Sequence, residues 1–333
     1  VFFAGQAEIG FQMPVGFDDL CHEQEFDQPG RRQAIEAQVA ESAERVFGVF
    51  GQPCRIATAQ IAEIFAPGVI SDGGVFGLTL SPDGKTAVFV RAYGGRDSLH
   101  LFIAQFENGN WSTPVRAPFS TSGKKWSDID PAFSPDGKLL LFNSNRPLAA
   151  GQSKEDFDIW GVKRTQTGWG EAFHLGTVIN TDSSDIYATV ANSGNIYFSS
   201  NRAGGQGKLD IYLSEYRNGA YQKPQNLGAE INTQNHDSNP FISPKEDYLI
   251  FWRQDPGGFG ASDLYISFKK KNTWTKAVNL GPTINTEIGE FCPFMQPKGK
   301  KLFFARTRVN GAGRVENIYS IDFSAKQFKT IQK

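Results

Sequence analysis

The sequence is poor in the residues from which metal sites and nucleophilic triads are built. Its 333 residues include only 3 Cys, 4 His and 2 Met. The cysteines Cys21, Cys54 and Cys292 show no CxxC spacing, and no histidine is placed to complete a zinc site with them. A disulfide between Cys21 and Cys54 is one pairing that the sequence permits, and unpaired thiols are the alternative. No GxSxG or HExxH motif occurs, so these hydrolase signatures are missing as well.

Long apolar runs and an excess of one charge are also missing. No stretch of about 18 apolar residues occurs, which predicts that no helix of the chain spans a membrane. The 34 Lys and Arg residues almost balance the 35 Asp and Glu residues, for a formal net charge of -1. Such a chain has no long-range attraction to nucleic acid or to anionic lipid, so neither is an expected partner.

The sequence is rich instead in 35 Gly, 28 Phe and 17 Pro, and 39% of its residues are hydrophobic. Phenylalanine favours strands, glycine and proline favour turns, and the hydrophobic content is sufficient for a sizeable core. The composition therefore indicates many short strands in an all-β fold.

One phrase recurs five times from residue 78 onward. The copies read LTLSPDGKTAVFVRA, AFSPDGKLLLFNSNR, TVANSGNIYFSSNR, FISPKEDYLIFWR and FMQPKGKKLFFAR. They are anchored, 52 to 57 residues apart, at Ser81, Ser134, Ala191, Ser243 and Gln296. In SPDG, proline sets φ, aspartate bonds to its own backbone and glycine accepts a positive φ. The phrase therefore marks a turn between two strands of a repeated unit and is not a catalytic signature.

Each copy is followed by further strand-like runs. Three units close on nearly the same words, HLGTVINT, NLGAEINT and NLGPTINT. An aromatic residue stands near the fourth run of every unit: Trp111, Trp169, Tyr221, Trp274 and Phe328. Four short strands per repeat predict the blades of a β-propeller, because a single sheet cannot cover both of its faces but radially packed blades can.

These residues resemble the WD40-like propeller repeat of the Tol type (TolB-like), whose FSPDGK and DIY phrase stands here at residues 133–160. The resemblance covers roughly residues 61–333, and the first and third units depart from it at SLH (98–100) and ANSG (191–194). It implies a bacterial protein of the periplasm or cell surface that binds partners, or a non-catalytic domain beside a hydrolase. The implied location is periplasmic or extracellular.

We predict a propeller over residues 61–333 with five blades, and a six-bladed ring is the alternative. Residues 62–72 resemble the closing segment at 278–287, so we expect them to complete the last blade. Residues 1–60 break the repeat and are predicted to form an N-terminal extension that is partly helical or disordered. The chain begins without methionine and without the pattern of a secretory signal, so its start does not identify a compartment.

Four of the five units carry a carboxylate six residues before the anchor. These residues are Asp128, Asp185, Asp237 and Glu290. If the strands that follow them line the channel, their side chains form a ring at its mouth, with His236 beside Asp237. Such a ring suits a ligand, a glycoside-cleaving carboxyl pair or Ca²⁺. The other interpretation is structural, because a residue repeated in nearly every unit commonly holds neighbouring blades together.

An arginine is expected to end the second strand of each unit: Arg91, Arg146, Arg202, Arg253 and Arg306. In three of these units an aspartate begins the third strand: Asp158, Asp210 and Asp263. We expect an ion pair across that hairpin, which makes the arginines structural.

The predicted function is a non-enzymatic binding module that recognises a protein or a cell-envelope carbohydrate through its loop face and channel mouth. The candidate ligand-binding residues are Asp128, Asp185, His236, Asp237 and Glu290. The alternative is a carbohydrate-active enzyme, a hydrolase or lyase, that uses the same carboxylates. No cofactor is expected unless the ring holds Ca²⁺, no catalytic residue is assigned, and the expected state is a monomer.

Overall fold

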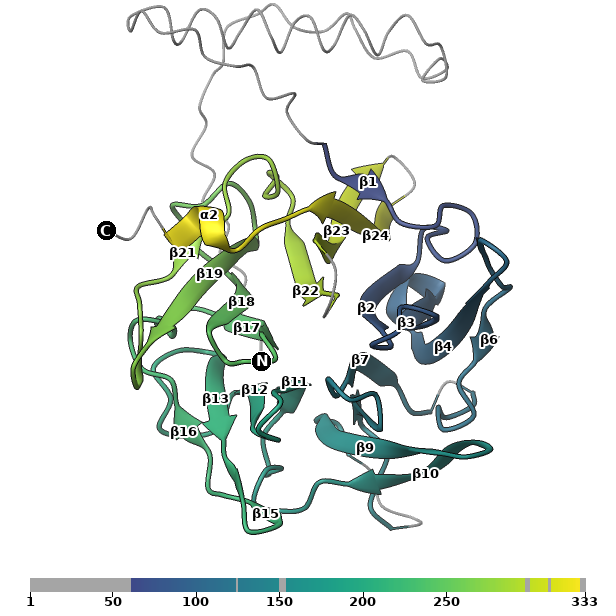
Figure 1. The fold of residues 1–333 in the computed structure, drawn as a ribbon, viewed down its shortest axis with the longest axis horizontal. Helices are drawn as coiled ribbons and strands as arrows, with labels where there is room; N and C mark the ends of the chain where they lie inside the picture. Colours follow the sequence, from purple (N-terminus) through teal and green to yellow (C-terminus); the bar gives the residue numbers. More distant parts are fainter. Residues whose placement is uncertain (1–60, 124, 150–153, 297–299, 311–312, 330–333) are drawn as a thin grey trace, which may run out of the picture. The chain divides into compact units, whose positions relative to one another are not determined.

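The computed structural model describes residues 61–123, 125–149, 154–296, 300–310 and 313–329. In this part of the chain, antiparallel sheets form five blades around a central channel (Figure 1). The prediction of an all-β, five-bladed propeller is confirmed. The predicted extension at residues 1–60 and the proposed Cys21–Cys54 pairing lie outside the described residues.

The first three blades follow one another along the chain. Blade 1 contains β2 (Val75–Leu80), β3 (Thr86–Tyr93), the 3-10 turn η1 (Gly94–Arg96), β4 (Ser98–Glu107), β5 (Asn110–Trp111) and β6 (Val115–Arg116). Blade 2 contains β7 (Asp128–Phe133), β8 (Leu139–Ser144), β9 (Asp158–Thr165) and β10 (Gly168–His174). Blade 3 contains β11 (Asp185–Val190), β12 (Ile196–Ser200), β13 (Asp210–Ser214), β16 (Gln225–Asn226) and a separate hairpin of β14 (Tyr216–Arg217) and β15 (Ala220–Tyr221).

The last two blades complete the ring. Blade 4 contains β17 (Asp237–Ile242), β18 (Tyr248–Arg253), β19 (Asp263–Lys270), β20 (Thr273–Trp274) and β21 (Val278–Asn279). Blade 5 contains β22 (Glu290–Met295), β23 (Lys301–Asn310), β24 (Gly313–Asp322) and β1 (Glu63–Ile64), and the short helix α2 (Lys326–Lys329) follows it. The first strands β2, β7, β11, β17 and β22 are innermost, and each contacts the next around the channel.

Strand β1 closes the ring by joining the two ends of the propeller. It pairs antiparallel with β24, with Glu63 opposite Ser320 and Ile64 opposite Tyr319. The ring of Phe65 then packs edge-on against Trp111 of blade 1 at 5.7 Å and Phe303 of blade 5 at 5.1 Å between centroids. The expected contribution of residues 62–72 to closure is therefore confirmed.

The SPDG turns have the predicted chemistry. In blade 2, the Asp136 carboxylate accepts hydrogen bonds from the Ser134 hydroxyl at 2.7 Å and from the Lys138 backbone N–H at 3.1 Å. Gly137 has a φ of 72°, in the left-handed region that favours glycine. The turn thus fixes the register of the first two strands of the blade.

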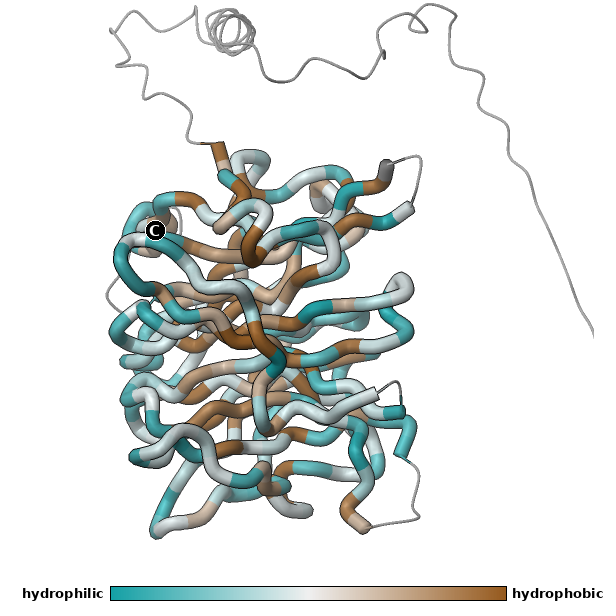
Figure 2. Tube along the Cα trace, turned by 90° about the vertical axis from the view of Figure 1, so that its right-hand side faces the viewer, coloured by the Kyte–Doolittle hydropathy of each residue, from teal (hydrophilic) through white to brown (hydrophobic). Residues whose placement is uncertain are grey.

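The hydrophobic core lies between neighbouring blades. One cluster joins Tyr197 and Ile211 of blade 3 to Leu249 and Phe251 of blade 4, and all four side chains are fully buried. Figure 2 shows hydrophobic segments running through the interior and hydrophilic ones concentrated in the connections. Since burying apolar area is the main favourable term in folding, each blade is stabilised chiefly by its neighbours. No helix among the described residues is long and apolar enough to cross a membrane.

Replacing Phe65 by alanine should lower the free energy of unfolding by about 2 kcal/mol, because its half-buried ring contacts two blades. The ring of Phe106 also contacts Trp111, with centroids 5.1 Å apart, but 38% of the Phe106 surface is exposed. Phe106→Ala should therefore cost under about 1 kcal/mol. Urea unfolding of both variants measures the difference, and equal losses would contradict a closing role for Phe65.

Candidate functional site

The four predicted ring carboxylates begin the inner strands at one end of the channel. Asp128, Asp185, Asp237 and Glu290 are the first residues of β7, β11, β17 and β22, and each has 0% exposed surface. Each forms an ion pair with the arginine near the end of the second strand of its own blade. The Arg146–Asp128 and Arg253–Asp237 pairs have N–O distances of 2.6 Å, and the Arg306–Glu290 distance is 2.7 Å.

The same carboxylates bind the connection that arrives from the preceding blade. The Asp185 carboxylate accepts hydrogen bonds from the backbone N–H and the hydroxyl of Thr181, and Arg202 donates to the Ile179 carbonyl. Equivalent threonine bonds reach Asp128, Asp237 and Glu290. Each pair therefore joins an inner strand to the preceding blade, and this is the structural role considered from the sequence. Ligand binding by these carboxylates stays a prediction.

Blade 1 uses a different residue for the same purpose. Val75 occupies the position of the carboxylate, and Arg91 pairs instead with Asp72, in the connection before β2, at 2.8 Å. The carboxylate has thus moved from the strand to the connection, while the ion pair is kept.

The expected partners of the arginines were wrong. Asp210 and Asp263, which begin third strands, bind their own loops: Asp210 accepts from the Gly207 N–H at 3.0 Å and Asp263 from the Gly260 N–H at 3.1 Å. A Cβ atom on Gly258 would lie only 2.3 Å from an Asp263 oxygen. The glycine-rich stretches are therefore explained by loops that wrap closely around an aspartate.

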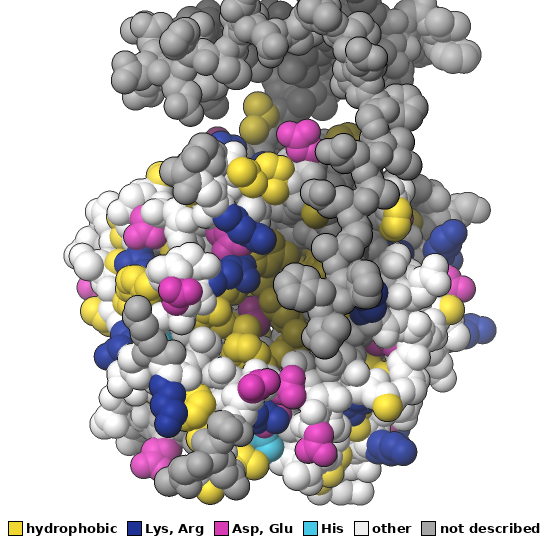
Figure 3. Space-filling view, turned by 180° about the vertical axis from the view of Figure 1, so that it is seen from behind, with side chains coloured by type: hydrophobic (Ala, Val, Ile, Leu, Met, Phe, Trp, Pro, Cys, Tyr) yellow, Lys and Arg dark blue, Asp and Glu magenta, His cyan; other side chains and the backbone are white. Residues whose placement is uncertain are grey.

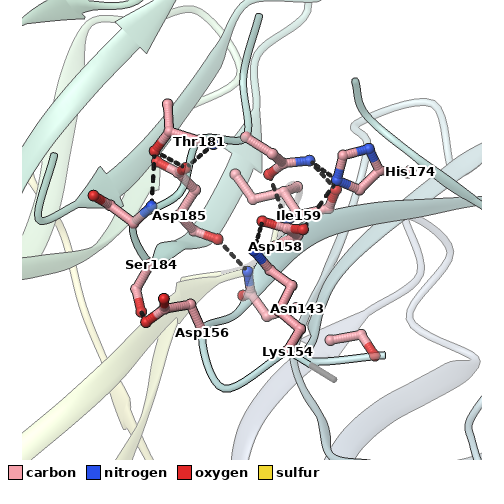
Figure 4. A network of polar contacts seen from close by, with 12 residues as sticks. Asn143, Lys154, Asp156, Asp158, Ile159, His174, Thr181, Ser184 and Asp185 are labelled. Atoms are coloured by element: carbon pink, nitrogen blue, oxygen red, sulfur yellow. Dashed lines mark hydrogen bonds and ion pairs between the residues drawn. The ribbon is translucent and has the colours of Figure 1, made fainter. Parts of the chain in front are cut away.

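In blade 2 the equivalent aspartate has a lysine and a histidine as neighbours. Asp158 lies 3.2 Å from the Lys154 ammonium and 3.1 Å from His174 Nε2 (Figure 4). In blades 3 and 4 an asparagine, Asn226 or Asn279, takes the place of the histidine. The expected Arg146–Asp158 pair is absent because Arg146 binds Asp128.

His236 lies beside the ring, as its position next to Asp237 predicts. Its ring stacks on Trp252 with centroids 6.2 Å apart, and the side chain is half-buried. Burial and the nearby Lys208 lower the pKa of His236, and Asp237 opposes them. A contact of His236 with a ligand stays a prediction.

A second ring, which the sequence did not reveal, lies deeper in the channel. Each inner strand contains a β-bulge where two residues face one residue of the second strand. The first bulge residue has a φ of 50° to 59° in every blade: Gly77, Asp130, Tyr187, Asn239 and Cys292. We call these five residues the bulge ring.

The bulge ring lines a cavity of about 40 Å³. Asp130 and Asn239 are 5% and 3% exposed, and Asp130 Oδ2 and Asn239 Nδ2 have no hydrogen-bond partner. The Cys292 thiol is 3.8 Å from Asp130 Oδ1. Because a buried polar atom without a partner costs free energy, these two atoms are suited to meet a ligand atom or water.

Arg96 lies near the entrance to the bulge ring. It comes from η1, and its guanidinium forms several hydrogen bonds with the Glu316 carboxylate of blade 5, the shortest being 2.7 Å. The guanidinium also lies over the Phe76 ring, 4.4 Å from its centroid, and 5.8 Å from that of Phe291. The entrance thus combines a cation with aromatic surface.

Burial disfavours the charged forms of the ionisable groups of the bulge ring. It raises the pKa of Asp130 well above its usual range, although the charge of Arg96 opposes this effect. Burial, reinforced by Asp130, raises the pKa of the Cys292 thiol and of the Tyr187 phenol. Burial therefore favours the protonated form of Asp130, which can donate a hydrogen bond, and it makes Cys292 a thiol and a poor nucleophile.

The described residues that line this cavity provide one carboxyl group. Glycoside hydrolysis ordinarily needs two, one as acid and the other as base or nucleophile. The cavity holds about three waters, at 10–15 Å³ for each, and is smaller than a sugar ring. Among the described residues, no group of three or more His, Cys, Asp or Glu side chains is arranged to hold a metal ion.

Comparisons with known proteins support the fold. No protein-family model and no curated protein matches the sequence. Among solved structures, a glycoside hydrolase is similar with a TM-score of 0.53 and 13% identity, over 86% of this chain and 97% of that one. A thermostable family-43 glycoside hydrolase has a TM-score of 0.51 and 12% identity, over 78% and 94%. A protein assigned as TolB from Agrobacterium tumefaciens has a TM-score of 0.44 and 16% identity over 70% of each chain. At these identities the likeness to the two hydrolases shows the propeller fold alone.

The bulge ring could have been found from a different signal in the repeats. Its residues stand four positions before the anchors and differ in every unit, whereas the carboxylates six positions before them are nearly constant. Residues that are constant across units support the shared fold, and polar residues that vary at one equivalent position indicate where the units differ in chemistry.

Asp185→Asn should lower the free energy of unfolding by about 3 kcal/mol, because it leaves the largely buried Arg202 without its counter-charge. Asp182 lies in the same connection but is exposed, so Asp182→Asn should change stability by less than about 0.5 kcal/mol. Urea unfolding compares the two variants. Similar small changes in both would contradict the structural role of the ion pairs.

Asp130 should make the protein less stable as the pH rises. Its pKa in the unfolded chain is near 3.8 and is raised on folding, so its contribution is complete below pH 3.8 and is lost as the pH approaches the folded-state pKa. Asp130→Asn keeps a neutral side chain that tolerates the left-handed backbone. The melting temperature of this variant should fall less than that of the parent between about pH 5 and pH 8. Identical slopes would show that Asp130 does not titrate in this way.

Proposed function

We propose that the chain is a non-catalytic binding module that recognises a protein or cell-envelope ligand at the channel mouth. The observation that carries this proposal is that the two rings of polar residues differ in whether their polar atoms have partners. The repeated carboxylates are buried and paired with arginines, whereas two polar atoms of the bulge ring have no partner.

The chemistry of the bulge ring indicates which ligand group enters. A protonated Asp130 offers an O–H donor, and Asn239 Nδ2 offers N–H donors. Two converging donors suit an oxygen acceptor such as a carbonyl or a hydroxyl. Because the cavity is small, only one such group of the ligand enters it.

The rest of the ligand would lie on the surface around the opening. Figure 3 looks onto one end of the channel, where hydrophobic side chains line a hollow and charged side chains lie around it. Phe76 and Phe291 beside Arg96 provide a surface for an apolar or planar group. Both a peptide and a glycan present such groups next to carbonyl or hydroxyl oxygens.

The alternative is a carbohydrate-active enzyme. It is less well supported because the ring carboxylates form ion pairs and the bulge ring has a single carboxyl group. The Tol-type resemblance of the repeats supports a binding role and a periplasmic or extracellular location, and both stay proposals. Ca²⁺ binding at the mouth also stays a proposal, which the experiment below includes.

The first test incubates the protein with arabino- and xylo-oligosaccharides, peptidoglycan fragments and short peptides, with and without Ca²⁺. We expect at least one class to raise the melting temperature without releasing new reducing ends. Asn239→Gly should abolish the rise, because it removes the amide and copies the residue that blade 1 carries at the same bulge, Gly77. Asn110→Leu, at an exposed position, is the control.

Three results would count against the proposal. New reducing ends that disappear in Asp130→Asn would make the protein an enzyme. A rise in melting temperature that persists in Asn239→Gly would place the ligand elsewhere, and no rise with any class would argue against recognition at the mouth.

A further inference from the structure

A groove of about 830 Å³ lies between blades 2 and 3, far from the channel mouth. It is formed by the turns after the first strands of the two blades, by the end of β10 and by the β14–β15 hairpin. These turns are at the opposite ends of the inner strands from the ring carboxylates. Its volume falls in the range of ligand-binding sites, which is about 300–1,000 Å³.

The groove lies where the aromatic residue of the fourth run is a tyrosine instead of a tryptophan. In blades 1, 2 and 4, a tryptophan of the fourth run packs into the junction with the preceding blade. The ring centroid of Trp169, for example, lies 5.1 Å from that of Phe119, and the centroid of Trp274 lies 6.1 Å from that of Tyr197. Blade 3 carries the smaller Tyr221 at this position, which packs against the cluster between blades 2 and 3 and contacts the Tyr216 ring, with centroids 5.1 Å apart. A tyrosine fills less space than a tryptophan, and the groove lies beside this tyrosine.

The walls of the groove are unusually apolar for a surface. Phe173, Val178 and Tyr216 line it with 38%, 50% and 43% of their surface exposed. Leu139 and Leu175 add partly buried aliphatic surface. Exposed hydrophobic side chains scattered singly need no explanation, but several that line one groove mark an interaction site.

The charges at the groove are mainly positive. Lys138 and Lys163 line it, together with one carboxylate, Asp136, which binds its own turn and lies 3.8 Å from the Lys138 ammonium. Lys163 lies over the Phe173 ring at 5.8 Å, and in the described part of the chain no carboxylate lies within ion-pair distance of it. An occupant with negative charge is therefore favoured over a neutral or basic one.

The geometry points to an acidic peptide segment of a partner protein that inserts an aromatic side chain into this groove. The aromatic group takes the space that a tryptophan fills at the other junctions. Acidic residues beside it meet Lys138 and Lys163. This site is separate from the proposed channel mouth and does not depend on it.

The test uses fluorescence anisotropy at low ionic strength with labelled peptides. The probe is Glu-Glu-Trp-Glu-Glu, and the comparison peptides are Glu-Glu-Ala-Glu-Glu and Lys-Lys-Trp-Lys-Lys. We expect saturable binding of the probe at one site and binding at least about tenfold weaker for each comparison peptide. Equal binding of all three, or no binding of the probe, would overturn the proposal.

Two lysine variants provide a matched pair for locating the site. Lys138 and Lys85 are both exposed and follow Asp-Gly in the same kind of turn, but only Lys138 lines the groove. Lys138→Glu should weaken binding of the probe about tenfold, while Lys85→Glu should leave it within about twofold. Equal effects would mean that the peptide responds only to overall charge.

A third variant tests the shape of the groove. Tyr221→Trp introduces the residue that blades 1, 2 and 4 carry, so it should raise the melting temperature and weaken binding of the probe at least about tenfold. Unchanged binding in this variant would overturn the proposed position of the aromatic side chain. Asn239→Gly should bind the probe like the parent, which separates this proposal from recognition at the channel mouth.

Discussion

The buried pair of a carboxylate and an arginine is the interaction on which the arrangement of the blades depends. In four blades it joins the start of the inner strand, the end of the second strand and the connection from the preceding blade. A buried ion pair gives little net stability compared with hydrophobic residues of similar volume, but losing one partner is costly. Its value here is geometric, because it sets where each blade begins relative to the previous one. Blade 1 shows that the requirement is the pair itself, since Asp72 supplies the carboxylate when Val75 cannot.

Most of the fold could be predicted from the sequence because each blade repeats the same pattern of strands and turns. The regular spacing of the SPDG-like turns identified the second strands, and residues 62–72 indicated how the ring closes. The partners of the arginines could not be predicted, since Asp128 and Asp158 are both near Arg146 in the sequence and only the sheet places one of them against it. The variation at one position of the repeat points to the bulge residues, but it does not reveal the bulge itself. A bulge is defined by the register of two strands, which the sequence of Asp130 or Asn239 alone does not contain.

The molecule therefore uses two kinds of position along each inner strand. The first residue is almost constant and supports the ring, while the bulge residue, two positions later, differs in all five blades. The bulges turn their residues towards a common centre, so five positions far apart in the chain form one cavity. Change at these positions alters the chemistry of the cavity without altering the ion pairs. The junction between blades 2 and 3 shows the same principle outside the channel, because one change of aromatic side chain leaves a groove.

The pairing of β1 with β24 also has a consequence for how the chain folds. Their paired residues, such as Glu63 and Ser320, are more than 250 positions apart, so their contact closes a very long loop. During synthesis, β1 emerges before any blade exists and must wait, unpaired, until β24 has been made. The last blade is the one that completes the ring, and its outer strand is the oldest part of the propeller. Folding of the whole ring is therefore expected to be slow and to depend on the end of the chain, because the contacts of highest sequence separation form last.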